Sequence, residues 1–187
     1  MLRRNIKYFN KHFPLQDHLV ALIGDKKEVK VADLGSGPLV ITGSLLDGVK
    51  VEIYPSDLRD YSYFWEGVNS TPLFKVELQD MEKLTYEDNF FDIVNCVNAL
   101  DHTVDAVSAI KEMLRVVKPK GWVYIDCSLY QMSTTGGRHR WDAKEDGTFT
   151  SMLNEFNLKD FGFDVKFIDN HGHRRYNHVI GIYQKKG

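Results

Sequence analysis

The sequence predicts an α/β fold in which helices cover a mostly parallel β-sheet. Residues 29–34 form an apolar, β-branched run that ends at a glycine turn, as expected for a short buried strand. Residues 90–100 form a near-continuous apolar run, which is typical of a strand in a parallel sheet covered on both faces. The chain has 187 residues, 43% of them hydrophobic and 27% charged, so it is long enough to bury a substantial core.

The other elements can be placed in order along the chain. Apolar residues at helical spacing in 15–23, with Pro14 as a candidate first residue and Gly24 as a candidate stop, predict a helix that packs beside the first strand. Residues 39–46 have the apolar content and length of a second helix. The pattern further predicts strands at 49–57, 73–78, 122–126, 163–169 and 177–184, a helix between Thr103 and Pro119, a long loop at 128–146 and a helix at 151–158.

Composition and charge argue against several classes of partner. The net charge is -2 and the isoelectric point is about 6.4, so nucleic acid and anionic membranes exert no general attraction. No apolar run approaches the roughly 18 residues of a membrane span. Cys96 and Cys127 both lie in apolar, strand-like runs. We therefore expect buried, reduced thiols in a cytoplasmic protein.

The glycine turn after the first strand is the strongest candidate for a ligand site. A strand, a glycine turn and a helix in that order bring backbone N–H groups and the positive end of a helix to one point. The glycines leave no side chain between the backbone and a ligand. A dinucleotide site fits poorly, because the third glycine of its fingerprint is missing and Pro38 has no N–H to donate.

The same stretch resembles motif I of the class I S-adenosylmethionine-dependent methyltransferases, which is an apolar strand running into D-x-G-x-G. Here the motif is Asp33-Leu34-Gly35-Ser36-Gly37. Residues 91–94 resemble the F-D-x-V motif of that family, with an aspartate that we expect to be structural. Residues 114–121 resemble its L-R-V-L-K-P-G-G turn, with lysine in place of the first glycine. These motifs occur in the family's order, and the resemblance covers about residues 29–127.

The resemblance implies a fold and a domain plan. The fold would be Rossmann-like and doubly wound, with a seven-stranded sheet whose last strand is antiparallel and inserts between its neighbours. One class I methyltransferase domain would span residues 1–187. Residues 1–28 would be an N-terminal lid or helix, 29–127 the cofactor-binding core, and 128–187 a substrate loop with the closing strands.

The resemblance also implies S-adenosylmethionine as the cofactor and assigns residues to it. Asp57, about twenty residues beyond the glycines, would hold the two ribose hydroxyls, which a carboxylate can accept. Asp80 would accept from the adenine amino group, and Met81 would pack on the ring. A structural turn aspartate at 57 is the alternative. The expected cofactor-binding residues are Asp33, Gly35, Ser36, Gly37, Asp57, Leu58, Asp80, Met81 and Asn98.

His102 is the candidate catalytic residue. It stands where the fourth strand ends, nearest the methyl group by the geometry of the family, and its imidazole could act as a general base on a hydroxyl acceptor. Asp101 could orient that imidazole or belong to a helix cap. His139, His171 and His173 are secondary candidates. The sequence offers no persuasive set of metal ligands.

The expected function is methylation of a small molecule, at an oxygen atom. The Asn/Asp-Pro-Pro-Tyr signature of amino methyltransferases is absent after the fourth strand, where residues 98–101 read Asn-Ala-Leu-Asp. One alternative is modification of RNA through basic residues at 3–11 and Arg138, Arg140, Arg174 and Arg175, although nucleic acid is the less favoured partner. The other alternative is a cofactor-binding protein without catalysis.

Overall fold

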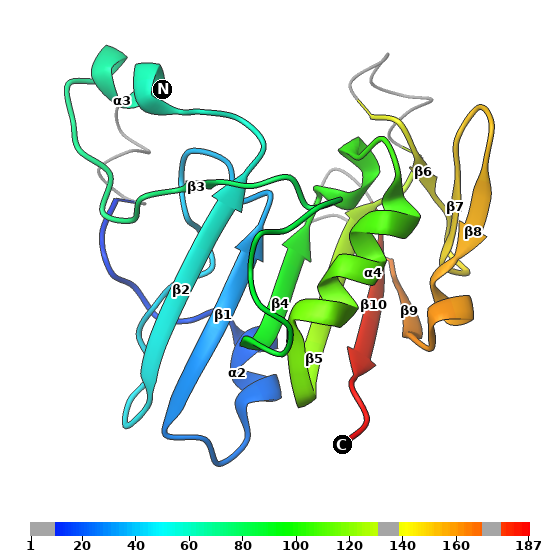
Figure 1. Cartoon of the computed structure of the whole chain (residues 1–187), viewed down its shortest axis with the longest axis horizontal. Helices are drawn as coiled ribbons and strands as arrows, with labels where there is room; N and C mark the ends of the chain where they lie inside the picture. Colours follow the sequence, from blue (N-terminus) through cyan, green and yellow to red (C-terminus); the bar gives the residue numbers. More distant parts are fainter. Residues whose placement is uncertain (1–9, 131–138, 170–176) are drawn as a thin grey trace.

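A seven-stranded β-sheet forms the centre of the computed structural model, which describes residues 10–130, 139–169 and 177–187 (Figure 1). The strand order is β3-β2-β1-β4-β5-β10-β9. The strands are β1 (Glu28–Leu34), β2 (Lys50–Asp57), β3 (Glu77–Leu78), β4 (Phe91–Val97), β5 (Val117–Ser128), β9 (Asp164–Ile168) and β10 (His178–Gln184). Neighbouring strands from β3 to β5 are parallel, whereas β10 is antiparallel to both β5 and β9. The predicted sheet, with an inserted antiparallel last strand, is confirmed.

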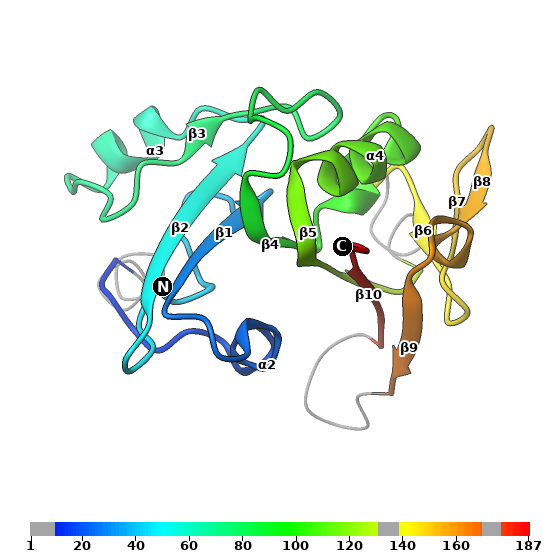
Figure 2. The same ribbon diagram turned by 60° about the horizontal axis from the view of Figure 1, so that its bottom comes forward.

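Helices lie on both faces of this sheet. Figure 2 shows α2 (Asp17–Ile23) on one face and α4 (Ala106–Val116) on the other. Leu19 and Ile23 of α2 are buried against β1, as the sequence predicted, and also against β4. Gly24 ends the helix, as predicted. Pro14 does not open α2, because it forms a β-bridge with Leu45 instead. A further short helix, α3 (Ser62–Gly67), follows β2.

The helix predicted at 39–46 is absent, and this corrects the sequence analysis. The backbone of this segment bonds to the segment before α2 rather than to itself: Leu15 donates its N–H to the Leu45 carbonyl at 2.8 Å, and Gln16 donates to the Thr42 carbonyl at 2.9 Å. Gly43 has a φ of +77°, and a Cβ there would lie 2.1 Å from the Pro14 carbonyl oxygen. The close approach of these two segments therefore replaces a helix, and no helix dipole follows the glycine turn.

The helix predicted at 151–158 is also absent. Strands β7 (Thr148–Thr150) and β8 (Glu155–Asn157) form a hairpin there, with β6 (Asp142–Ala143) as the third strand of a small antiparallel sheet. The Phe149 and Phe156 rings stack across the hairpin with centroids 5.2 Å apart. The predicted loop at 128–146 thus contains a strand. A 3-10 helix, η2 (Leu158–Phe161), follows the hairpin.

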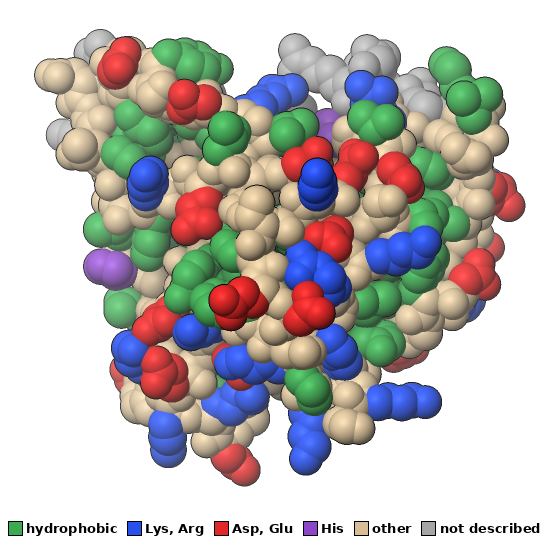
Figure 3. Space-filling view, viewed as in Figure 1, with side chains coloured by type: hydrophobic (Ala, Val, Ile, Leu, Met, Phe, Trp, Pro, Cys, Tyr) green, Lys and Arg blue, Asp and Glu red, His purple; other side chains and the backbone are tan. Residues whose placement is uncertain are grey.

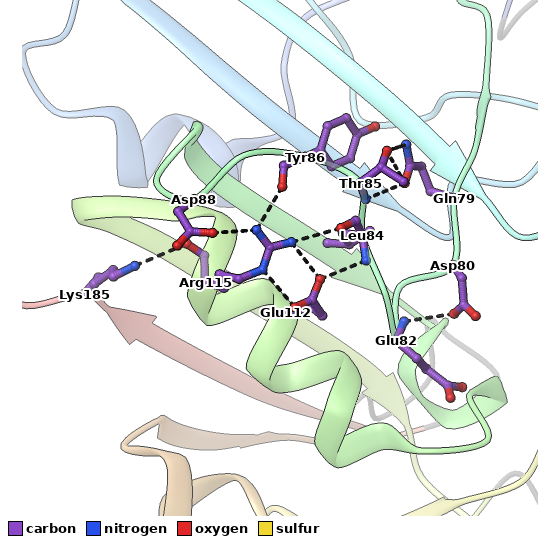
Figure 4. A network of polar contacts seen from close by, with 10 residues as sticks. All are labelled: Gln79, Asp80, Glu82, Leu84, Thr85, Tyr86, Asp88, Glu112, Arg115 and Lys185. Atoms are coloured by element: carbon purple, nitrogen blue, oxygen red, sulfur yellow. Dashed lines mark hydrogen bonds and ion pairs between the residues drawn. The ribbon is translucent and has the colours of Figure 1, made fainter.

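Arg115 on α4 ties the segment between β3 and β4 to the body of the domain (Figure 4). Its guanidinium donates to Glu112 at 2.7 and 2.8 Å, and also to the carbonyls of Leu84 at 3.0 Å and Tyr86 at 2.9 Å. Glu112 in turn accepts from the backbone N–H of Leu84 at 2.8 Å. A planar guanidinium can serve several acceptors at once. This network anchors the segment that carries two of the predicted cofactor-binding residues.

Two further expectations concern buried polar groups. Asp92 accepts from the ammonium groups of Lys26 and Lys118, each at 2.8 Å, at the start of β4, so its role is structural as predicted. Cys96 and Cys127 are free, buried thiols, and burial raises the pKa of each.

Among the helices that the structure describes, none has the length and apolar character needed to span a bilayer.

Candidate functional site

The carboxyl ends of β1, β2, β3 and β4 lie at one edge of the sheet, which is the upper edge in Figure 1. Ligands of open α/β sheets bind beyond this edge. The segments that follow these four strands contain nearly all of the predicted site residues. The register of a parallel sheet, rather than closeness in sequence, therefore brings them together.

The glycine turn and Asp57 are in direct contact. The Gly37 backbone N–H donates to Asp57 Oδ2 at 3.1 Å, and the Arg59 N–H donates to Oδ1 at 3.0 Å. Gly35 and Ser36 donate their N–H groups to the Ser56 carbonyl at 2.8 and 3.1 Å, which fixes the turn against the end of β2. The Tyr61 side chain also bonds the Asp57 carboxylate, and because the two carboxylate oxygens together can accept about four hydrogen bonds, Asp57 still has acceptor capacity. Asp57 is half-buried and can present that capacity to a ligand.

Gly35 and Gly37 serve different purposes. A Cβ on Gly35 would lie 2.3 Å from the Ala99 Cβ and 3.5 Å from the Met81 Cε, so protein atoms already fill the space beside it. A Cβ on Gly37 would meet no atom of the described residues within 4 Å. From the sequence we expected open space along the whole turn, and the structure restricts it to Gly37. Gly35 instead allows the end of β4 to approach the turn.

Asp33 lies beneath the turn and is 5% exposed. Its carboxylate accepts from Asn95 Nδ2 at 3.0 Å and from the Thr42 hydroxyl at 3.2 Å. Burial raises the pKa of Asp33 to about 6, against the opposing effect of these two hydrogen bonds. Neither Asn95 nor Thr42 was predicted as a site residue. The signal for Asn95 was its polar side chain inside the apolar run of β4.

The residues after β2 and β3 lie at the open edge. Leu58 is 68% exposed, and Asp80 is exposed as well. Asp80 accepts from the Glu82 N–H at 2.9 Å, which leaves acceptor capacity on its carboxylate. Met81 is half-buried, close to Gly35. An exposed acid beside apolar side chains is a suitable surface for a purine, so the assignment of these residues stays a prediction that the geometry allows.

Asn98 links the ends of β4 and β5. It has a φ of +50°, and its Oδ1 accepts from the N–H of Ser128 at 2.9 Å and from the Ser128 hydroxyl at 3.0 Å. The amide oxygen is thereby saturated, and the amide NH2 group of this exposed residue is available to a ligand. Ser128 neighbours a buried pair that the sequence did not reveal, in which His178 Nδ1 lies 2.6 Å from Asp126 Oδ1.

Asp101 and His102 form the 3-10 helix η1 (Leu100–His102) directly after β4. Asp101 is 1% exposed, and its Oδ2 contacts His139 Nδ1. The His139 ring also lies 4.2 Å from the ring of the exposed His102, centroid to centroid. The sequence treated His139 as a secondary candidate and suggested that Asp101 orients His102. In the structure both imidazoles lie near Asp101, and the imidazole that contacts its carboxylate is that of His139.

Backbone contacts hold His139 at this position. The N–H groups of Arg140 and Trp141 donate to the Asp101 carbonyl at 2.8 and 3.1 Å. The indole N–H of Trp141 donates to the Thr103 carbonyl at 3.0 Å, and the ring is buried. A lone tryptophan within a polar segment was the signal that this segment docks. The candidates His171 and His173, and the arginines at 138, 174 and 175, lie outside the described residues.

The group formed by Asp101, His102 and His139 has the composition of a metal site. Each residue offers one ligand atom, and the three atoms lie within 4.8 Å of one another. In the part of the chain that the structure describes, this is the one such group found. This set of ligands was not evident from the sequence, because His139 is distant from Asp101 along the chain.

Comparisons with known proteins identify the family of this domain. Residues 32–125 match the family described as "Methyltransferase domain". The ubiquinone/menaquinone biosynthesis C-methyltransferase of Neisseria meningitidis is 32% identical over 122 residues, which are 62% of this chain and 47% of that protein. The tRNA U34 carboxymethyltransferase of Trichodesmium erythraeum is 27% identical over 59% of this chain and 35% of that protein. The chain thus spans less than half the length of either relative.

A solved structure extends the likeness to most of the fold. The S-adenosylmethionine-dependent methyltransferase of Clostridium acetobutylicum superposes with a TM-score of 0.55 and 15% identity, over 91% of this chain and 90% of that one. At this identity the likeness concerns the fold alone. The family match covers half of the chain, from the end of the first strand to the fifth. The chain therefore belongs to the methyltransferase-domain family and has the fold of the class I S-adenosylmethionine-dependent methyltransferases.

Proposed function

We propose that this protein transfers a methyl group from S-adenosylmethionine to an oxygen atom of a small molecule. The observation that carries the cofactor assignment is the contact between Gly37 and Asp57 beside the open space at Gly37. A carboxylate held by backbone N–H groups at the edge of a parallel sheet suits the two hydroxyls of a ribose. When bound, S-adenosylmethionine supplies an electrophilic methyl group on a sulfonium.

Each end of the cofactor would meet a different set of residues. Asp57 would accept from the ribose hydroxyls, and Asp80 with Met81 and Leu58 would hold the adenine. Asp33 lies under the glycine turn and would act by shaping it, because its carboxylate already accepts from Asn95 and Thr42.

The acceptor would bind beside η1. Ala99, the residue before η1, packs against Gly35, so η1 begins next to the glycine turn. The acceptor must be aligned there and, if it is a hydroxyl, must lose a proton. We assign both tasks to Asp101 and His102, with His139 as their partner. A neutral imidazole of His102 is the simplest proton acceptor at this place.

RNA modification is the second candidate function, and its support is the likeness to a tRNA enzyme. Most of the basic residues on which it depends lie outside the described residues. On the face shown in Figure 3, Lys and Arg are interspersed with Asp and Glu rather than gathered into one basic surface. Steep weakening of RNA binding as salt rises would favour this function.

The proposal can be tested in two measurements on the full chain. Calorimetry with S-adenosylmethionine and with its demethylated product should show binding in a single site. A screen with labelled methyl donor should then show salt-insensitive incorporation into small hydroxyl compounds. Binding without incorporation into any metabolite or RNA would support the non-catalytic alternative, and incorporation only into carbon, nitrogen or RNA acceptors would overturn the assignment to oxygen.

A further inference from the structure

We propose that Asp101, His102 and His139 bind a divalent transition-metal ion, of the zinc class. One carboxylate and two imidazoles place a ligand atom each within 4.8 Å of one another. Imidazole nitrogen suits zinc, iron, cobalt, nickel and copper, whereas magnesium and calcium prefer oxygen ligands. The ligand set therefore selects a transition ion.

A second observation comes from the Asp101 carboxylate itself. Asp101 is 1% exposed, and its Oδ1 has no hydrogen-bond partner among the residues that the structure describes. The other oxygen, Oδ2, contacts His139 Nδ1. A buried carboxylate oxygen without a donor is unfavourable, and a cation is one of the few groups that can satisfy it. The orphaned oxygen and the two nearby imidazoles point to the same missing partner.

The surrounding backbone makes the site specific. Asp101 lies in η1, which follows β4. Its carbonyl accepts from the N–H groups of both Arg140 and Trp141, and these bonds hold Arg140, the residue next to His139, in place. Zinc bonds to nitrogen of about 2.1 Å require ligand atoms roughly 3.4 Å apart in a tetrahedral site. Closing a separation of up to 4.8 Å needs only a modest shift of the ligand atoms.

The number of ligands indicates an open site. Three protein ligands leave at least one coordination position for a water or a substrate, as in catalytic zinc sites, whereas structural zinc sites use four. The ion would also be next to the residue, Ala99, that contacts the glycine turn.

The metal site indicates which class of molecule accepts the methyl group, and this step rests on the proposed function. A small molecule with a hydroxyl group would bind the ion through that oxygen. Coordination lowers the pKa of the hydroxyl, so its proton leaves to solvent and the oxygen stays on the ion as an alkoxide or phenolate. The ion keeps its oxidation state. Asp101, His102 and His139 would then act as ligands, and no separate base would be needed.

Metal binding can be tested without any turnover. Untagged, chelator-treated protein is titrated with Zn²⁺ in a calorimeter and with Co²⁺ in an absorption spectrometer. The wild type should bind one ion, with visible Co²⁺ bands of nitrogen and oxygen ligation. His102→Ala, which changes an exposed side chain, and His139→Ala should each weaken Zn²⁺ binding at least tenfold. Asp101→Asn retains the shape of the side chain and should do the same. His12→Ala is the matched control, because His12 is exposed and bonds Ser44.

The same samples separate this proposal from the proposed function. Binding of the demethylated cofactor is measured with and without Zn²⁺ for every variant. If the wild type binds the cofactor but neither metal, the metal site is wrong and His102 returns to the role of a base. If Zn²⁺ binds equally well to wild type, His102→Ala and His139→Ala, the ion uses other residues and the proposal is also wrong. If metal binds as expected but the cofactor does not, the metal site stands and the proposed function falls.

Discussion

The backbone N–H of Gly37 lies 3.1 Å from a carboxylate oxygen of Asp57, twenty residues further along the chain. This hydrogen bond joins the loop after β1 to the last residue of β2, the adjacent parallel strand. It brings the most recognisable motif of the sequence to the acid that the family resemblance assigns to the ribose. The cofactor proposal depends on this contact more than on any other.

Replacing Asp57 with alanine should weaken cofactor binding. The variant loses acceptors for two ribose hydroxyls, and hydrogen bonds to a charged group contribute about 1.5–3 kcal/mol each. We expect at least a tenfold weaker dissociation constant for the demethylated cofactor, measured by calorimetry. Asp60→Ala is a suitable control, since Asp60 accepts from Ser62 at the start of α3 and has no assigned ligand. Equal affinity of Asp57→Ala and wild type would show that Asp57 is only a turn residue.

The two glycines of the turn should respond differently to alanine. Gly35→Ala forces a methyl group to within 2.3 Å of the Ala99 Cβ, so the variant should lose about 1–3 kcal/mol of stability. The methyl group of Gly37→Ala meets no atom in the part of the chain that the structure describes, and its cost is the strain of a φ of +66°, about 1 kcal/mol. Gly37→Ala should nevertheless bind cofactor poorly, because the methyl group enters the ligand space. Thermal unfolding and calorimetry on both variants measure the two effects.

A Gly37→Ala protein with normal cofactor affinity would place the ligand elsewhere. A Gly35→Ala protein as stable as the wild type would mean that β4 can withdraw from the turn without cost. Both results are informative because the two substitutions are chemically identical and only two residues apart.

Asp33 should make the stability of the cofactor-free protein depend on pH. Burial raises its pKa to about 6, so between roughly pH 4 and pH 6 the folded state holds a proton that the unfolded chain has released. Stability from this group is therefore present at low pH and is lost as pH rises through about 6. The loss should be on the order of 3 kcal/mol. Asp33→Asn cannot titrate and should lack this component.

Urea unfolding of wild type and Asp33→Asn between pH 4 and 7 isolates the contribution, since other groups titrate equally in both proteins. As pH rises, the unfolding free energy of the wild type should fall relative to that of Asp33→Asn. A constant difference across this range would mean that Asp33 is already ionised at low pH.

Arg115 should matter for both stability and order near the cofactor site. Lysine keeps the charge but cannot serve Glu112 and the carbonyls of Leu84 and Tyr86 together. We expect Arg115→Lys to lower the free energy of unfolding by about 1–2 kcal/mol. Hydrogen exchange should quicken in residues 79–88 more than in β1. If residues 79–88 exchange at the same rate in Arg115→Lys and in the wild type, other contacts anchor the segment.

The regular elements followed from local sequence signals. Apolar runs predicted the central strands, Gly24 predicted the end of α2, and the order of motifs predicted the sheet and its antiparallel β10. Hydrophobic period and turn chemistry are properties of a few consecutive residues, so a linear reading can find them. The positions of Gly37 and Asp57 followed for the same reason, since each marks the end of a predicted strand.

Only the tertiary structure decided what the irregular segments do. Residues 39–46 lost their predicted helix because their backbone bonds to the segment at 13–16. Residues 148–157 form a hairpin because Phe149 and Phe156 stack with each other against the core. Apolar content alone does not say which backbone groups will find distant partners.

The candidate catalytic group divides in the same way. Asp101 and His102 were found from their place after β4, where local sequence predicts the edge of the sheet. His139 joined them because Arg140 and Trp141 donate to the Asp101 carbonyl, a contact between residues almost forty positions apart. Such a contact forms only after the chain has folded, because its stability depends on burial of Trp141 and Asp101 together. The sequence determined which residues could bind a ligand, and long-range packing determined which of them meet.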